Sequence, residues 1–199
     1  RFFYVVFGDQ LNMINWSTII ICLSLASMVY GNFVAMSQQN LKRMLGYSSI
    51  AHAGYLMIAL AIIGIPDAIE AAGSSILFYL TAYAATNLAA FIAIALLAQF
   101  SDSEMISDLE GLRERAPLVA IGLMISLISL TGLPPTGLFF GKIYIFFAAL
   151  ENGYWWLSLA GVLNSFVSAY YYLRPVRLMF KVNKNISVEY EPASTSNIL

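Results

Sequence analysis

A single lysine interrupts a long apolar stretch of this sequence. Residues 118–150 carry no charge other than Lys142, which lies nine residues before Glu151. Nine helical residues span about 13 Å, roughly twice the reach of a lysine side chain, so the amine is not expected to reach the aqueous boundary. An unpaired lysine in mid-membrane costs on the order of 3 kcal/mol. We therefore predict a proton-transfer group at Lys142; the alternative is a structural ion pair with another subunit.

A second group of polar side chains shares one face of an expected helix and consists of Ser48, Ser49, His52 and Tyr55. His52 is the only histidine of the chain, and an imidazole gains and loses a proton near neutral pH. A proton relay is one interpretation of His52. The other is a neutral ring that is hydrogen-bonded to a serine or to a facing helix.

Two further polar stripes lie in apolar segments. The first consists of Tyr79, Tyr83, Thr86 and Asn87, and it is interpreted either as part of a proton pathway or as helix–helix packing. The second consists of Asn164, Ser168 and Tyr171, and it is interpreted as packing.

The segment that carries Lys142 cannot be one straight helix, because Gly132, Leu133, Pro134 and Pro135 interrupt it. The two prolines lack N–H groups, and Pro134 disfavours the helical conformation at Leu133. In a membrane, an interrupted backbone persists only where protein or a hydrated cavity covers it, and such helices often form ion sites. We predict a non-helical break near mid-membrane, with Lys142 on the second half-helix, nearer the non-cytoplasmic side.

The composition is that of an integral membrane protein. Hydrophobic residues make up 60% of the chain and charged residues 11%, with a mean hydropathy of +0.76. The net charge of −1 does not indicate a nucleic-acid partner. One cysteine and one histidine cannot by themselves build a zinc, haem c or iron–sulfur site, and no glycine-rich nucleotide fingerprint occurs. The chain is expected to hold no metal, cofactor or redox site of its own.

The predicted fold class is an all-α polytopic transmembrane helical bundle of five full spans, one of them discontinuous. The spans are residues 15–36, 44–65, 72–98, the discontinuous 117–150, and 154–180. The transmembrane domain is expected over residues 1–182 and a polar tail over 183–199. Residues 1–7 lack an initial methionine and resemble the end of a helix, so a fragment is expected. Met105, Leu109 and Leu112 predict a short surface helix within residues 101–116.

The charges alternate between the two ends of these spans. One end carries Lys42, Arg43, Arg113, Arg115, Arg174, Arg177, Lys181 and Lys184. The other carries Asp9, Asp67, Glu70 and Glu151. The positive-inside rule places the basic end in the cytoplasm or its equivalent. Lys42 is most simply a determinant of this topology, and it is also kept as a candidate pathway residue.

Two motifs resemble one known family. Residues 38–56, QQNLKRMLGYSSIAHAGYL, resemble the signature shared by the antiporter-like membrane subunits of complex I and by Mrp-type cation/proton antiporters. Residues 129–146, SLTGLPPTGLFFGKIYIF, and the run AYYYLR at 169–174 most resemble the branch of NADH:quinone oxidoreductase called subunit N or chain 2, and its photosynthetic relative. The resemblance extends from residue 1 to about residue 180.

The resemblance implies a fourteen-helix fold with two inverted five-helix repeats, of which this chain would hold the second, helices nine to thirteen. It implies that Lys142 matches the lysine of the second broken helix, His52 a histidine of helix ten, and Tyr83 a position of helix eleven. In the family these positions belong to a chain of buried polar groups that carries protons. Charged groups of the first repeat lie outside this sequence, so the chain is not expected to pump alone.

The expected function is a proton-translocating membrane subunit of a redox-driven NADH (or ferredoxin):quinone oxidoreductase. The candidate pathway residues are Lys142, His52, Tyr83, Tyr79, Ser49, Asn87 and Lys42. Expected partners are the lipid bilayer and other membrane subunits, with flavin, iron–sulfur clusters and the quinone site in different subunits. The expected location is a bacterial inner membrane or a thylakoid membrane. The alternatives are an Mrp-type sodium/proton antiporter subunit and a structural half-module that conducts nothing.

Overall fold

The computed structural model describes residues 16–98 and 104–181, and within these ranges the regular structure is helical. The calls on residues 1–15, on Lys184 and on the tail lie outside the described residues. The elements are α2 (Trp16–Ser37), α3 (Leu41–Ile62), η1 (Pro66–Ala68), α4 (Ile69–Leu97), η2 (Ile106–Leu109), α5 (Leu112–Arg115), α6 (Pro117–Thr131), α7 (Gly137–Glu151) and α8 (Trp155–Met179).

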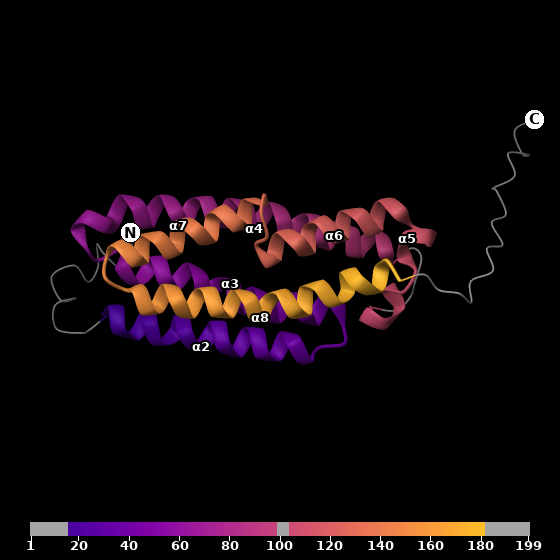
Figure 1. Cartoon of the computed structure of the whole chain (residues 1–199), viewed down its shortest axis with the longest axis horizontal. Helices are drawn as coiled ribbons and strands as arrows, with labels where there is room; N and C mark the ends of the chain where they lie inside the picture. The colour runs from indigo at the N-terminus through magenta and orange to yellow at the C-terminus, as the bar shows by residue number, and fades with distance from the viewer. Residues whose placement is uncertain (1–15, 99–103, 182–199) are drawn as a thin grey trace, which may run out of the picture.

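The long helices lie side by side along one axis, and α6 and α7 follow each other end to end beside α4 (Figure 1). Helix α8 contacts both α6 and α7 on one side and α2 on the other. Helix α3 contacts α2, α4, α7 and α8. The junction between α6 and α7 is therefore enclosed by α4 and α8, and α3 lies close to α7.

Among the residues that the structure describes, three helices, α2, α3 and α4, are long and apolar enough to cross a membrane. Helices α6 and α7 have 15 residues each, about 22 Å, which is too short for a hydrocarbon core of about 30 Å. Helix α8 has 25 residues, and its polar residues make it less apolar than α2 to α4. The paired short helices follow from the break at residues 132–136.

The tightest helix pair is α2 with α3, because two glycines let the backbones approach. A methyl group added at Gly31 would lie 2.6 Å from the backbone nitrogen of Ala51, and one added at Gly54 would lie 2.8 Å from that of Met28. The approach also lets the Ser24 hydroxyl donate to the Gly54 carbonyl at 2.7 Å. Small residues are the usual means of bringing helices together in membranes.

Helix α3 begins at Leu41, three residues before the predicted start of its span. The reason is a cap: the Asn40 side chain accepts a hydrogen bond from the backbone N–H of Arg43 at 3.0 Å. Lys42 and Arg43 thus lie in the first helical turn rather than in the preceding loop.

The connection between α4 and α6 contains two short turns rather than the single helix expected around Met105, Leu109 and Leu112. Gly111 separates the turns with a left-handed backbone, φ 71°. Leu109 and Leu112 are buried, whereas Met105 is exposed. The connection is held to the start of α3, since the Leu41 N–H donates to the Glu104 carbonyl at 2.9 Å.

Candidate proton-transfer site

The break between α6 and α7 leaves backbone carbonyls without helical partners. Helix α6 ends at Thr131, and Gly132 turns the chain with a left-handed backbone, φ 83°. In a continuous helix the carbonyls of Leu130 and Thr131 would accept from residues 134 and 135, which here are prolines without N–H groups. The carbonyl end of a helix also carries the negative end of its dipole. The end of α6 is therefore suited to a cation.

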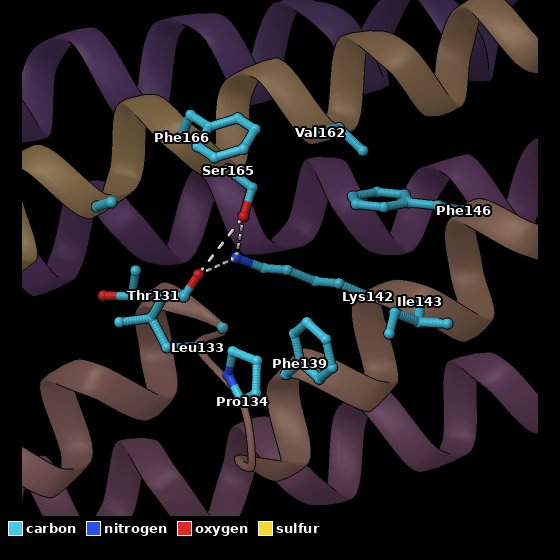
Figure 2. A pocket seen from close by; sticks show the side chains of 12 residues that line it. Thr131, Leu133, Pro134, Phe139, Lys142, Ile143, Phe146, Val162, Ser165 and Phe166 are labelled. Atoms are coloured by element: carbon cyan, nitrogen blue, oxygen red, sulfur yellow. Dashed lines mark hydrogen bonds between the residues drawn. The ribbon is translucent and has the colours of Figure 1, made fainter.

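The Lys142 amine fills this position (Figure 2). From the second turn of α7 it reaches back across the break and donates to the Thr131 carbonyl at 2.7 Å and to the Ser165 hydroxyl of α8 at 2.8 Å. Its nitrogen also lies 5.0 Å from the centre of the Tyr55 ring of α3, within the range of a cation–π contact. The lysine is 3% exposed. The groups around this buried amine thus come from α3, from α8 and from the end of α6 at the break.

A cavity of about 270 Å³ adjoins the amine between the break and α8. Its polar end is formed by Lys142 and Ser165, and side chains such as Phe139, Phe146 and Phe166 form its apolar walls (Figure 2). The space is large enough for several water molecules, which need polar partners such as those at the amine end.

His52 forms the centre of a second buried cluster. Its Nδ1 lies 2.6 Å from the Tyr79 hydroxyl of α4, and its Nε2 lies 3.2 Å from the Tyr172 hydroxyl of α8. The Tyr83 ring stacks on the imidazole with centroids 4.7 Å apart. A neutral imidazole has one donor and one acceptor nitrogen, so one tyrosine donates to it and the other accepts. A proton gained by His52 would make both nitrogens donors.

Tyr55 stands between the two clusters. Its ring meets the His52 ring edge-on, with centroids 5.8 Å apart, and the Lys142 amine lies over the same ring. Lys142 and His52 come from different helices, α7 and α3, and are ninety residues apart in the sequence. Folding brings them to either side of one tyrosine.

An amide extends the polar interior toward α2. The Tyr171 hydroxyl donates to Asn32 Oδ1 at 3.0 Å, and Asn32 Nδ2 donates to Asn164 Oδ1 at 3.2 Å. Asn32 Nδ2 also lies 3.5 Å from the Tyr55 hydroxyl. Tyr171 and Asn164, interpreted from the sequence as packing residues, thus belong to the same buried polar network as Tyr55.

Four residues of this interior were missed by sequence reasoning: Asn32, Thr131, Ser165 and Tyr172. A signal existed for Asn32, an amide within an uncharged span of 22 residues. None existed for Thr131, which takes part through its backbone carbonyl, or for Ser165, whose hydroxyl matters only because Lys142 points toward it.

The other predicted pathway residues lie around these clusters or away from them. Ser49 donates to the Gly46 carbonyl at 2.6 Å and lies beside the Tyr83 hydroxyl. Asn87 is half-buried on α4. Lys42 is exposed and forms an ion pair with Glu104, about 15 Å along α3 from His52. The structure therefore groups Lys142, His52, Tyr79 and Tyr83, and it leaves Lys42 at the surface.

Glu104 is the acidic partner in that surface ion pair. Hydrogen bonds from the Lys42 amine and the Asn40 side chain, followed by the positive charge of Lys42 itself, hold the pKa of the Glu104 carboxyl below its ordinary value. The pair joins the start of α3 to the connection that follows α4.

Comparison with known proteins shows which family the chain belongs to. A family model described as NADH:quinone oxidoreductase/Mrp antiporter, TM, matches residues 2–168. NADH-quinone oxidoreductase subunit N of Dehalococcoides mccartyi is 42% identical over 181 residues, which are 90% of this chain and 37% of that protein. NAD(P)H-quinone oxidoreductase subunit 2 of Trichormus variabilis is 43% identical over 164 residues, covering 82% of this chain and 31% of that protein.

A solved structure of a related protein also matches this chain. A chain of respiratory complex I from Thermus thermophilus with bound aureothin matches with a TM-score of 0.69 and 36% identity, over 82% of this chain and 36% of that one. The present chain thus spans about a third of the length of the proteins it matches. Since the family model covers most of the sequence, the chain belongs to the NADH:quinone oxidoreductase/Mrp antiporter transmembrane family and is an integral membrane protein.

Proposed function

We propose that this chain is the part of a proton-translocating membrane subunit of an NADH (or ferredoxin):quinone oxidoreductase in which protons are exchanged at a buried lysine. The observation that carries this proposal is the Lys142 amine, which is buried at the break between α6 and α7 and is separated from the His52 cluster by one tyrosine ring. Relatives that are 42% and 43% identical carry the names of such subunits.

In the proposed mechanism, the protonation of Lys142 responds to charge changes elsewhere in the assembly. The protonated amine is stabilised by the Thr131 carbonyl, the Ser165 hydroxyl and the Tyr55 ring. Two positive charges in one buried site repel each other strongly, so a proton arriving at His52 favours release from Lys142, and the reverse holds. The tyrosines around His52 can donate and accept protons at the same atom, which suits them to short transfers.

The membrane arrangement that we propose has five crossings: α2, α3, α4, the pair α6 and α7 as one discontinuous crossing, and α8. They correspond to helices nine to thirteen of the fourteen-helix family fold. Alternation of basic and acidic ends supports this assignment, with Lys42 and Arg177 at one end and Asp67 and Glu151 at the other. Lys142 then lies on the half nearer the acidic, non-cytoplasmic side of a bacterial inner membrane or thylakoid membrane.

Electron transfer takes place in other subunits in this proposal. Flavin, iron–sulfur clusters and the quinone site belong to those partners, and this chain contributes only groups that hold and move protons. The side chains that gather at the break are an amine, a hydroxyl and aromatic rings, which is consistent with that division.

An Mrp-type sodium/proton antiporter subunit is the second candidate, since the family description covers both kinds of protein. The named relatives favour the first candidate. The dependence of proton movement on sodium separates the two, because a sodium/proton antiporter subunit moves protons only in exchange for sodium ions.

Lys142→Ala tests the proposed function. In membrane vesicles that contain the assembled complex, we expect proton uptake per electron to fall severalfold. Electron transfer to a water-soluble acceptor should persist, because the redox centres lie elsewhere. Lys181→Ala, at an exposed ion pair with Glu110, is the matched control. Normal pumping by a fully assembled Lys142→Ala complex would refute the proposed role.

A further inference from the structure

Ser165 supplies a hydroxyl to an amine that must change its protonation state. Within the described residues, the Lys142 nitrogen has two hydrogen-bond acceptors, the Thr131 carbonyl at 2.7 Å and the Ser165 hydroxyl at 2.8 Å. The Ser165 hydroxyl also lies 3.4 Å from the Thr131 carbonyl, to which it can donate. Lysine, serine and carbonyl therefore form a closed triangle at the end of α6 (Figure 2).

The two acceptors differ in what they can do after the amine loses its proton. A carbonyl only accepts hydrogen bonds, whereas a hydroxyl both donates and accepts. Next to an ammonium, the Ser165 oxygen accepts from Lys142 and its hydrogen can point to Thr131. Next to a neutral amine, the same hydroxyl can rotate and donate to the nitrogen lone pair. A serine at this position keeps a partner for both forms of the lysine.

We propose that Ser165 is a positioning residue that holds the Lys142 amine at the break in both of its protonation states. This inference rests on the proposed function, since it concerns the same proton-exchange step. Without the hydroxyl, no donor that the structure describes at the break bonds the lone pair of the neutral amine, which keeps only the Thr131 carbonyl as a hydrogen-bond partner and can swing into the adjoining 270 Å³ cavity. Its proton exchange with the His52 cluster would then slow.

Helix α8 contacts both the Lys142 amine, through Ser165, and the His52 ring, through Tyr172. Tyr172, which contacts His52 Nε2 at 3.2 Å, lies seven residues after Ser165, two helical turns along the same face. Ser168 lies between them, is buried, and donates to the Ser165 carbonyl at 2.6 Å. One face of α8 thus contacts both Lys142 and His52. Ser165 therefore fixes the amine to the same helix that orients the imidazole.

The test compares variants of Ser165 with a serine that has the same kind of interhelical bond. Ser158 is also on α8, is buried, and donates to the Phe146 carbonyl of α7 at 2.8 Å. Ser158→Ala removes an equivalent α7–α8 hydrogen bond without touching Lys142. In vesicles with the assembled complex, proton uptake per electron is measured between pH 6 and 9 for Ser165→Ala, Ser165→Thr and Ser158→Ala.

We expect Ser165→Ala to lower proton uptake per electron severalfold. It should also move the pH above which pumping falls toward acid by less than about one unit, because the hydroxyl bonds the charged amine more strongly than the neutral amine. Both Ser165→Thr and Ser158→Ala should keep the wild-type dependence of proton uptake on pH. Ser165→Val is compared with Ser165→Thr because the two side chains have the same shape and differ in the hydroxyl.

Equal pH profiles for Ser165→Val and Ser165→Thr, or for Ser165→Ala and Ser158→Ala, would overturn the positioning role. If Lys142→Ala abolishes pumping in the same preparation, the proposed function still stands in that case. If Lys142→Ala pumps normally, the proposed function itself fails. If Ser165→Ala prevents assembly of the complex, the comparison of Ser165→Val with Ser165→Thr still tests the positioning role.

Discussion

Replacing Pro134 and Pro135 together by alanine returns two backbone donors to the break. In a continuous helix these N–H groups would donate to the carbonyls of Leu130 and Thr131. The Thr131 carbonyl already accepts from Lys142 at 2.7 Å. The double substitution therefore sets a restored helix in competition with the lysine amine for the same acceptor.

The balance can be worked out from the groups at the break. A proline in a helix interior costs about 3 kcal/mol, so the double substitution favours closure by about 6 kcal/mol. Closure removes one hydrogen bond of the amine, about 3 kcal/mol at most, and places Gly132 in a helix at a cost of about 1 kcal/mol. These two costs, together about 4 kcal/mol, are smaller than the roughly 6 kcal/mol penalty that the substitution removes, so the balance shifts toward the closed helix.

The expected result is a severalfold loss of proton uptake per electron in an assembled complex that still transfers electrons. No titratable group is removed, so the loss would come from the displaced amine. The Leu133 and Thr136 amides now donate within the break to the carbonyls of Ile128 at 3.4 Å and Leu133 at 3.0 Å. Their hydrogen exchange should slow as the bonds of a continuous helix replace these two. Pro117→Ala is the matched control, because Pro117 is the first residue of α6, where proline costs little.

Two results would refute this reasoning in different ways. Slow exchange with unchanged pumping would show that the lysine works without the break. Unchanged exchange would show that the contacts of α7 with α4 and α8, rather than the prolines, keep the two half-helices apart.

Two other changes test the remaining contacts. Tyr79→Phe removes the hydroxyl 2.6 Å from His52 Nδ1 and leaves a buried nitrogen unpaired, at a cost of about 1–3 kcal/mol; we expect a lower melting temperature and slower pumping, whereas the exposed Tyr144→Phe should change neither. The depressed pKa of Glu104 means that its ion pair with Lys42 stabilises the surface connection at neutral pH, and that this contribution is lost as pH falls through the lowered pKa. Glu104→Gln should make hydrogen exchange at the Leu41 amide faster than in the wild type at pH 7, with pumping at pH 7 unchanged, and the difference should disappear once the pH has fallen below the lowered pKa; equal exchange rates at pH 7 would contradict the role of the pair.

The sequence by itself determined the class of protein, the helical segments and the interruption of the helix before Lys142. These properties depend on local chemistry. A run of apolar residues specifies a membrane helix, and two adjacent prolines remove backbone donors wherever the chain goes. Two helix boundaries differ from the prediction: α3 begins at Leu41 because the Asn40 cap bonds to Arg43, and Gly111 divides the connection that was expected to form one helix.

Only the tertiary structure decided which groups meet. Helical spacing placed His52 on a polar face, but it could not show that the two ring nitrogens meet tyrosines of α4 and α8. It also could not show that Lys142 turns back to the Thr131 carbonyl of α6 and reaches the Ser165 hydroxyl of α8. These contacts join residues 11 to 120 positions apart. They depend on how α3, α4, α7 and α8 pack, which a local pattern of residue types does not specify.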